Sequence, residues 1–312
     1  MEIIRGLESY PPDSPPTIVA LGTFDGVHLA HRRILATAVS RARALGLPAL
    51  GCTFTPHPLK VLRPERAPVP ITTLEENLAL IAEQGLDTTL VIAFTREFST
   101  IEPETFVQEV LHRTLKAREV VVGFNHTFGR GARGNAALLE ALAPTLGFIA
   151  RVVPPETVDG VVVSSSVVRQ ALRAGEVQRA MKFLGHPYTV RGRVGRGKGR
   201  GRQLGVPTAN LKPERELVLA PGVYAARASW AGGQGGAVVN VGVRPTFGEG
   251  EYWVEAHLLD FSGDLYDQQL SLAFLERIRP ERRFPSVEAL KVQVARDIET
   301  AAHLLASIPR CP

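Results

Sequence analysis

The hydrophobic pattern of this chain changes near Gly185, and this change constrains the fold more than any other feature. Before it, short apolar runs such as 17–21 and 49–54 alternate with longer segments that have helical periodicity. After it, short apolar runs follow one another without long helices, at 188–194, 222–230, 236–241, 251–260 and 268–274. The pattern predicts an α/β domain with a parallel sheet in residues 1–184 and a small antiparallel β-barrel in residues 185–312.

Length and composition are consistent with two such domains. The chain has 312 residues, of which 45% are hydrophobic, and this is enough for two cores. Cys52 and Cys311 are far apart and form no CxxC pair, so neither a disulfide framework nor a zinc site is expected, and a reducing cytoplasm fits. No apolar run approaches the roughly 20 residues that cross a bilayer, so no membrane segment is expected.

The chain has a net charge of +5, which favours anionic ligands, and its positive charge is concentrated between residues 191 and 202. The stretch Gly192–Asn210 reads GRVGRGKGRGRQLGVPTAN. Its glycines let backbone N–H groups approach a phosphate, and its arginines supply charge. The spacing matches neither GxxxxGKS/T nor GxGxxG. Thr208 and Asn210, two residues apart, can present two hard oxygen ligands to Mg²⁺ on one side of an extended segment.

Composition alone leaves two interpretations of this stretch open, a phosphate cradle or a solvated Arg/Gly loop that binds RNA nonspecifically. The PTAN ending counts against the second. The stretch resembles the flavokinase module of bacterial bifunctional riboflavin kinase/FAD synthetases, whose pattern is GxVxxGxxxGRxLGFPTAN. The resemblance implies that Thr208 and Asn210 hold Mg²⁺, and that the ATP phosphates are bound by Gly197, Gly201 and Arg202.

Two histidines lie at the start of a predicted helix that runs to about Leu45. The segment Gly22–His31 reads GTFDGVHLAH and follows the first apolar run. His28 and His31 are three residues apart, so they share a helical face at the helix N-terminus, where both can touch one phosphate. The alternative is that one histidine caps the helix and the other packs.

This segment resembles the HxGH signature of nucleotidyltransferases, in the GxFDGxHxGH form of the adenylyltransferase half of the same bifunctional enzymes. The resemblance implies a Rossmann-like nucleotidyltransferase domain in which Gly22 and Phe24 belong to the ATP-binding loop, and His28 and His31 take part in catalysis. Ala30 replaces the usual glycine between the histidines. Class I aminoacyl-tRNA synthetases carry a related motif and are the alternative for this half, although they are usually longer.

Two later segments resemble further motifs of the adenylyltransferase. GFNHTFG is similar to GxNFxFG, with His126 in place of phenylalanine, and implies that Asn125 holds nucleotide phosphates. SSSVVR is similar to ISSTxIR and implies that Ser165 and Arg169 bind the β- and γ-phosphates, although alone it is also the pattern of an ordinary serine-capped helix. His57 lies between two prolines after an apolar run. This position is equally consistent with a histidine that stabilises the turn and with one that contacts a ligand.

A carboxylate lies in the otherwise apolar run YWVEAHLL, residues 252–259, and alternation places Glu255 and His257 on one face. Burying a carboxylate without a partner is costly, whereas a glutamate that faces a ligand hydroxyl near Mg²⁺ can act as a general base. The run resembles VExHLLDF of the kinase family, in which this glutamate is the base. A cross-strand salt bridge is the alternative.

The C-terminal segment begins with Arg279–Phe284, RPERRF, after which Ser286 caps a predicted helix. Its apolar face should dock on the barrel and comprises positions 287, 290, 294, 298, 301 and 305. The segment is similar to the family's RPExxF and its helix, which closes over the isoalloxazine ring, so Arg279 and Phe284 are implied to contact flavin. For Phe284, core packing is equally consistent. NVGVRPTF, from Asn240, resembles NxGxRPTF and is expected to buttress the site.

The resemblance as a whole implies an enzyme that uses riboflavin, FMN, ATP and Mg²⁺. Residues 187–312 would phosphorylate the ribityl 5′-hydroxyl of riboflavin to give FMN, and residues 1–184 would adenylylate FMN to give FAD and pyrophosphate. The departures from the family patterns are Ala30, His126 and Val206. We expect a cytoplasmic protein without nucleic-acid or membrane partners, while a nucleic-acid-binding protein and a single-function nucleotidyltransferase are the alternatives. The sequence does not indicate an oligomeric state.

Overall fold

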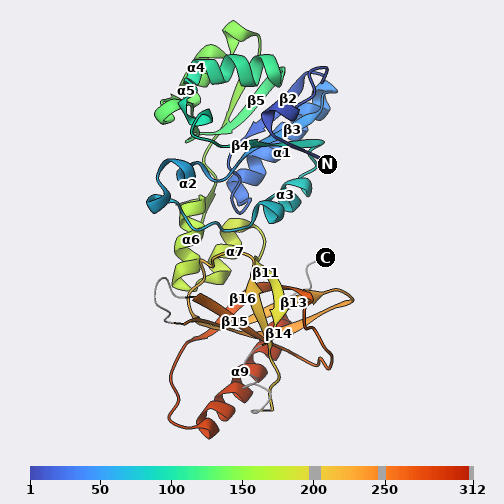
Figure 1. The fold of residues 1–312 in the computed structure, drawn as a ribbon, viewed down its shortest axis with the longest axis vertical. Helices are drawn as coiled ribbons and strands as arrows, with labels where there is room; N and C mark the ends of the chain where they lie inside the picture. The colour runs from blue at the N-terminus through green and yellow to red at the C-terminus, as the bar shows by residue number, and fades with distance from the viewer. Residues whose placement is uncertain (197–204, 245–250, 309–312) are drawn as a thin grey trace. The chain divides into compact units, whose positions relative to one another are not determined.

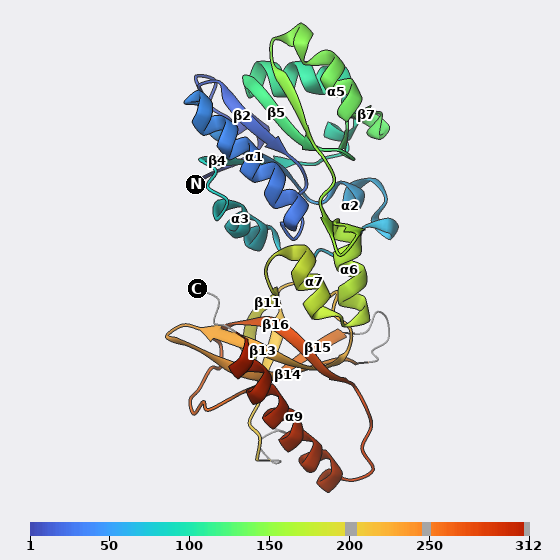
Figure 2. The ribbon, with the colours of Figure 1, turned by 180° about the vertical axis from the view of Figure 1, so that it is seen from behind.

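The structure is a computed structural model that describes residues 1–196, 205–244 and 251–308 (Figures 1 and 2). Contacts divide the chain into two compact units, formed by residues 1–68 with 72–164 and by residues 69–71 with 165–312. The predicted boundary between the functional domains lies later, between residues 184 and 185. The two helices before that boundary therefore group with the barrel in the second compact unit, while the functional boundary itself stays a prediction.

Within residues 1–164, all of which the structure describes, a six-stranded sheet has the order β1-β4-β3-β2-β5-β8. All of its strand pairs are parallel, as the alternation of strands and helices predicts. The strands are β1 (Glu2–Arg5), β2 (Thr17–Leu21), β3 (Ala49–Thr55), β4 (Thr88–Ala93), β5 (Ala117–Gly123) and β8 (Ile149–Val153). The predicted α/β fold is confirmed, and β1 adds an edge strand that the sequence pattern did not indicate.

The helical and minor strand segments of the first unit lie between or after these strands. The helices are α1 (Leu29–Leu45), α2 (Pro58–Leu62), α3 (Leu74–Ala82), α4 (Pro103–Thr105), the π-type helix η4 (Phe106–Thr114) and α5 (Ala136–Leu142). The 3-10 turns are η1 (Leu7–Ser9), η2 (Pro64–Arg66), η3 (Phe98–Thr100), η5 (Arg130–Ala132) and η6 (Pro144–Leu146). Two small ladders pair β6 (Thr127–Phe128) with β7 (Gly134–Asn135) and β9 (Thr157–Val158) with β10 (Val161–Val162).

Strand β2 shows how one sheet supports two hydrophobic cores. All of its side chains are buried, and they alternate between the faces of the sheet. Ile18 and Ala20 pack with residues of α1 and α3, whereas Val19 and Leu21 pack with residues of η4 and α5 on the other face. A central parallel strand covered on both faces needs such a continuous apolar run.

A buried ion-pair cluster holds α1 against the sheet. Glu119 of β5 is 2% exposed and contacts both Arg41 of α1, at 2.7 Å, and Arg151 of β8, at 3.0 Å. The hydrogen bonds from Arg41, followed by those from Arg151, lower the pKa of Glu119 to about 2. The cluster therefore stabilises the helix whose first residues carry the histidine pair.

In the second unit, the described strands close into a barrel with the order β11-β12-β15-β14-β13-β16. The strands are β11 (Tyr188–Gly195), β12 (Ala209–Pro213), β13 (Gly222–Trp230), β14 (Gly233–Arg244), β15 (Glu251–Leu258) and β16 (Gln269–Pro280). Two helices, α6 (Ser165–Ala174) and α7 (Val177–Leu184), precede the barrel, and α9 (Val287–Ser307) follows it. All barrel pairings are antiparallel, which confirms the predicted β-barrel with a C-terminal helix.

Helices α6 and α7 are bonded to the barrel at several points. Arg277 of β16 donates to the carbonyl of Ala174 at 3.2 Å, and Gln178 of α7 donates to Glu276 at 2.9 Å. A Cβ on Gly175, between the two helices, would lie 2.6 Å from the Arg277 guanidinium. Figures 1 and 2 show both helices beside the strands of the barrel. The helix pair is therefore part of the barrel's compact unit.

The C-terminal helix begins where the sequence predicts, because Ser286 Oγ accepts a hydrogen bond from the Ala289 N–H at 3.1 Å. Its burial is less extensive than the apolar pattern suggests. Val287 is 54% exposed, so the predicted buried face is wrong for the first turn, whereas Ala301 is fully buried against β13 and β14. None of the helices within the described residues has the length and hydrophobicity that crossing a bilayer requires.

Candidate active sites

His28 and His31 meet at the start of α1. His28 is the N-cap residue, and its Nδ1 accepts a hydrogen bond from the His31 backbone N–H at 3.4 Å. The two rings stack with centroids 3.6 Å apart. A capping Nδ1 carries no proton, so neutral His28 holds its proton on Nε2, where it can be donated to an anion. His28 thus caps the helix while His31 packs on Phe24, as one of the two interpretations predicts, and phosphate contact by the pair stays a prediction.

The turn before the histidines has a strained backbone. Phe24 and Val27 have φ angles of 47° and 39°, in the left-handed region that costs non-glycine residues energy, and both side chains are fully buried. The Phe24 ring packs edge-on against His31, with centroids 5.3 Å apart, and a Cβ on Gly22 would lie 2.9 Å from that ring. Because the Phe24 side chain is in the core, a contact with ATP would have to come from its backbone.

Side chains from a distant segment hold this turn in place. The Gly26 N–H lies 3.0 Å from both Thr72 Oγ1 and Asn77 Oδ1. Thr72 Oγ1 donates to Asn77 Oδ1 at 2.5 Å, and the Thr72 N–H donates to Asp25 Oδ1 at 3.3 Å. The three side chains are 7 to 9% exposed. We call Asp25, Gly26, Thr72 and Asn77 the turn clamp.

The GFNHTFG segment follows β5. Asn125 is exposed, and the next residue, His126, stacks on Phe128 with ring centroids 5.9 Å apart. Burial lowers the pKa of His126 to about 4, and its Nε2 has no hydrogen-bond partner among the described residues. His126 thus behaves as a neutral aromatic side chain, which is consistent with its place at a position where the family pattern has phenylalanine.

A row of three polar residues crosses the wall of the barrel. Asn210 of β12 is directly opposite Glu255 of β15, which is in turn directly opposite Asn240 of β14. Directly opposed residues on antiparallel strands have side chains on the same face. Their neighbours along the strands, such as Val239 and Val254, are buried inside the barrel, so the row faces outward. We call Asn210, Glu255 and Asn240 the polar row.

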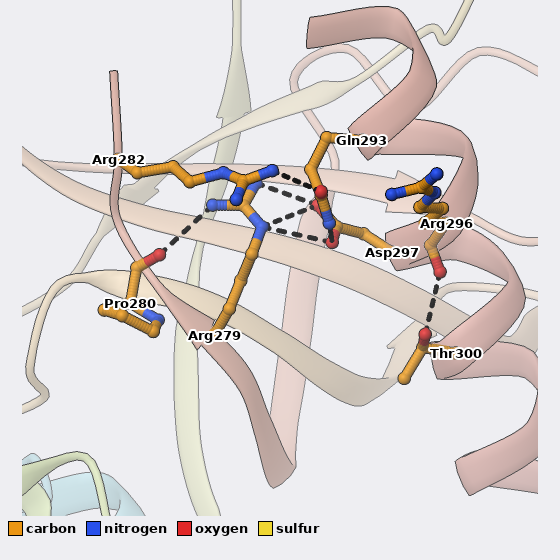
Figure 3. A network of polar contacts seen from close by, with 7 residues as sticks. All are labelled: Arg279, Pro280, Arg282, Gln293, Arg296, Asp297 and Thr300. Carbon is orange, nitrogen blue, oxygen red and sulfur yellow. Dashed lines mark hydrogen bonds and ion pairs between the residues drawn. The ribbon is translucent and has the colours of Figure 1, made fainter. Parts of the chain in front are cut away.

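The same register line continues toward α9. Asn240 is opposite Val223 of β13, which is opposite Arg279 of β16. Val223 packs in a cluster with Ala301 of α9, and Arg279 donates to both carboxylate oxygens of Asp297 at 2.8 to 3.1 Å. Figure 3 shows this ion pair between β16 and α9. The helix therefore covers the part of the outward face that lies next to the polar row.

The predicted flavin contacts lie at the start of this helix connection. Phe284 is half-buried, with the guanidinium carbons of Arg279 and Arg282 at 5.5 and 4.7 Å from its ring centroid. Arg282 also contacts Gln293 of α9 (Figure 3). Arg279 is engaged with Asp297, so its clearest role in the structure is to anchor α9. Flavin contact by Arg279 and Phe284 stays a prediction.

The PTAN segment is held from the opposite strand. His257 Nδ1 lies 2.8 Å from the Pro207 carbonyl oxygen, to which it can donate. Thr208 and Asn210 follow, both half-buried, and Asn210 begins the pairing of β12 with β11. His257 and Glu255 are on the same face of β15. One strand thus carries both the predicted base and the residue that positions the predicted metal ligands.

Comparisons with known proteins match two family models to two successive parts of the chain. The family model described as FAD synthetase matches residues 10–167, and the model described as riboflavin kinase matches residues 184–305. The bifunctional riboflavin kinase/FMN adenylyltransferase of Pseudomonas fluorescens is 37% identical over 307 residues, which cover 98% of each chain. The protein of the same description from Escherichia coli (strain K12) is 36% identical over 304 residues, or 96% of this chain and 97% of that one.

The chain belongs to the family of bifunctional riboflavin kinase/FMN adenylyltransferases. It has riboflavin kinase and FMN adenylyltransferase activities, both of which use ATP. A crystal structure from Streptococcus pneumoniae, described as that of a macrolide-efflux protein, superposes with a TM-score of 0.88 at 29% identity and covers 97% of this chain and 99% of that one. That likeness supports the fold of the bifunctional family.

The predicted phosphate-binding residues of the basic loop and of α6 are not tested by the structure. Gly197, Gly201 and Arg202 lie outside the described residues. Ser165 and Arg169 begin α6 in the second compact unit, where buried Arg169 donates to the Val69 carbonyl at 2.7 Å. Their binding of the phosphates of ATP stays a prediction.

His57 stabilises the local turn, which is one of the two roles that the sequence allows. It is the N-cap of α2, and its Nδ1 accepts a hydrogen bond from the Leu59 N–H at 3.2 Å. Ligand contact by this residue stays untested.

Sequence patterns missed the turn clamp and the role of His257. Thr72 and Asn77 are 46 and 51 positions from Gly26, so no local motif links them to the histidine turn. His257 could have been suspected, because strand alternation places it on the face of Glu255. Its bond to the Pro207 carbonyl depends on strand pairing.

Proposed function

We propose that riboflavin is phosphorylated on the outward face of the barrel, at the polar row, and that FMN is adenylylated at the histidine turn that opens α1. The observation that carries the kinase assignment is the register of β12 and β15, which sets Asn210 opposite Glu255. The residues opposite Glu255 on both neighbouring strands are Asn210 and Asn240.

In the kinase reaction, Glu255 accepts the proton of the ribityl 5′-hydroxyl as that oxygen attacks the γ-phosphorus of ATP, and ADP leaves. Thr208 and Asn210 supply a hydroxyl and an amide oxygen, which fit Mg²⁺ because this ion accepts few protein oxygens and completes its shell with phosphates and water. Bound there, Mg²⁺ would neutralise phosphate charge. His257 holds the Pro207 carbonyl and so keeps these two oxygens next to the polar row. Gly197, Gly201 and Arg202 bind the phosphates in this proposal.

In the adenylyltransferase reaction, a phosphate oxygen of FMN attacks the α-phosphorus of ATP and pyrophosphate leaves. His28 donates from Nε2 to the phosphates, and the stacked His31 adds a second imidazole beside it. Gly22 and Phe24 belong to the ATP-binding loop in this proposal, as the family motif implies. Asn125, Ser165 and Arg169 bind phosphate oxygens, as the family motifs imply. No covalent intermediate is needed, because positioning and charge stabilisation suffice.

We further propose that functional domains 1–184 and 185–312 carry the two activities, that the enzyme works in the cytoplasm, and that it has no nucleic-acid or membrane partner. Burial raises the pKa of the Cys52 thiol to about 12, so this cysteine stays an unreactive core residue. Cys311 lies outside the described residues. The basic loop before PTAN serves ATP in this proposal, so binding to RNA should be weak and lost at moderate salt.

The experiment is a time course with riboflavin, ATP and Mg²⁺ in which FMN and FAD are separated by chromatography. Wild-type protein should form FMN first and FAD later. The double variant His28→Ala/His31→Ala should accumulate FMN and form no FAD. If the folded double variant loses both activities, the assignment of the histidines to a separate adenylylation site is wrong.

A further inference from the structure

Asn240 is the member of the polar row that lies on β14. Its Oδ1 is buried and has no hydrogen-bond partner among the described residues. Leaving a buried acceptor unpaired is energetically costly, so such an atom calls for a partner. Asn240 is directly opposite Glu255 on the neighbouring strand, with its side chain on the same outward face.

We propose that Asn240 is a substrate-binding residue of the kinase, whose Oδ1 accepts a hydrogen bond from an internal hydroxyl of the ribityl chain. This inference rests on the proposed placement of the reacting hydroxyl at Glu255. Neighbouring strands are about 4.8 Å apart, and a polyol with a hydroxyl on each successive carbon spans that distance within a few atoms. With the terminal hydroxyl at Glu255, an internal hydroxyl therefore reaches Asn240.

The environment of the polar row supports a polyol rather than a ring at this position. The side chains of Asn210, Glu255 and Asn240 offer hydrogen-bonding groups on three neighbouring strands, in a line perpendicular to the strands. Val223 comes next in the line and is covered by α9. A hydroxylated chain laid along the row gives the Asn240 oxygen a donor, whereas the flat apolar part of a flavin would leave that oxygen unpaired.

The test compares riboflavin with lumiflavin, which keeps the flavin ring but lacks the ribityl hydroxyls. Affinity for each is measured by quenching of flavin fluorescence on the full-length protein with Mg²⁺ and ADP. Asn240→Leu should weaken riboflavin binding about three- to tenfold, the scale of one neutral hydrogen bond, and leave lumiflavin binding unchanged. The melting temperature should be unchanged or higher, because the variant removes an unpaired acceptor.

Gln234→Leu is the matched control, because Gln234 is an exposed residue of the same strand and face as Asn240. It should leave both affinities unchanged. Asn240→Ala gives a second variant with the same expected selectivity if the leucine does not fit. Equal weakening of both flavins, or unchanged riboflavin binding, would overturn the proposal, as would a lower melting temperature with parallel losses.

Failure of this inference can be told apart from failure of the proposed base. If Glu255 is not the base, Glu255→Gln retains riboflavin turnover whatever the ratio of the two affinities. If only the Asn240 proposal fails, Glu255→Gln loses turnover while Asn240→Leu keeps the wild-type preference for riboflavin over lumiflavin. A riboflavin analogue that lacks the contacted hydroxyl should bind wild type and Asn240→Leu equally well.

Discussion

The two candidate sites are held together in different ways. The polar row is set by backbone register, because Asn210, Glu255 and Asn240 are opposite one another on paired strands. The histidine turn is one loop with two residues in the left-handed region, and it is held by side chains of the turn clamp. The difference teaches that substitutions of support residues that touch no substrate should reduce activity more at the histidine turn than at the polar row.

The largest effect should come from separating the two compact units. A fragment of residues 165–312 keeps the barrel with α6 and α7, and should phosphorylate riboflavin while it forms no FAD. A fragment of residues 186–312 lacks the helices that are bonded to β16, so it should melt at a lower temperature. Equal melting temperatures for the two fragments would show that the helix pair does not stabilise the barrel.

At the polar row, the chemistry of one side chain should dominate. Glu255→Gln preserves shape but removes the proton acceptor, so kinase kcat should fall by about 10²–10⁴ with little change in riboflavin binding or melting temperature. Adenylylation of supplied FMN in the same preparation serves as the control and should be unchanged. Near-normal kinase turnover would rule out the base, and a lower melting temperature with modest parallel losses would indicate a structural role.

The anchor of α9 tests whether the barrel site also depends on a side-chain contact. Asp297 is 3% exposed and Arg279 is 16% exposed, so Asp297→Asn should cost about 3 kcal/mol of unfolding free energy. Both tryptophans, Trp230 and Trp253, lie in the second unit, so tryptophan fluorescence in urea reports its unfolding selectively. Arg296→Gln, an exposed neighbour in Figure 3, is the control and should change little. A loss no larger than that of the control would contradict the anchoring role.

The turn clamp should show the opposite behaviour, with a large effect on rate from a residue that touches no substrate. Thr72→Val keeps the shape of the side chain but removes the hydroxyl that bonds Gly26 and Asn77. FMN adenylylation should fall about tenfold to a hundredfold in kcat/KM, because small displacements of catalytic groups are costly, while kinase activity stays unchanged. Thr73→Val is the control, since Thr73 caps α3 and should affect stability only. Equal effects of the two variants would refute the clamp.

The smallest effect at neutral pH should come from His126. Its pKa falls from 6.5 to about 4 on folding, so the unfolded chain takes up the proton first as the pH drops. The free energy of unfolding of wild type therefore falls between pH 6.5 and about 4. The part of this fall that comes from His126 should be absent in His126→Phe. Melting curves at pH 8 and pH 5 measure it. A stability difference between wild type and variant that does not grow on acidification would contradict the burial of a neutral histidine.

Local sequence signals predicted the parts of both sites that depend on nearby residues. The HxxH spacing predicted that two imidazoles meet at a helix start, and alternation in YWVEAHLL predicted that Glu255 and His257 share a face. Ser286 was recognised as an N-cap. These outcomes depend on helix periodicity, strand periodicity and capping, which act within a few residues of the chain.

Tertiary structure alone decided which distant residues join these local elements. Strand pairing sets Asn210 and Asn240 beside Glu255, and burial in the first unit brings Thr72 and Asn77 to Gly26. The grouping of α6 and α7 with the barrel was equally absent from the local pattern. Register and docking depend on contacts between segments that are far apart in sequence, where the free energy comes from packing of complementary surfaces and no short motif records it.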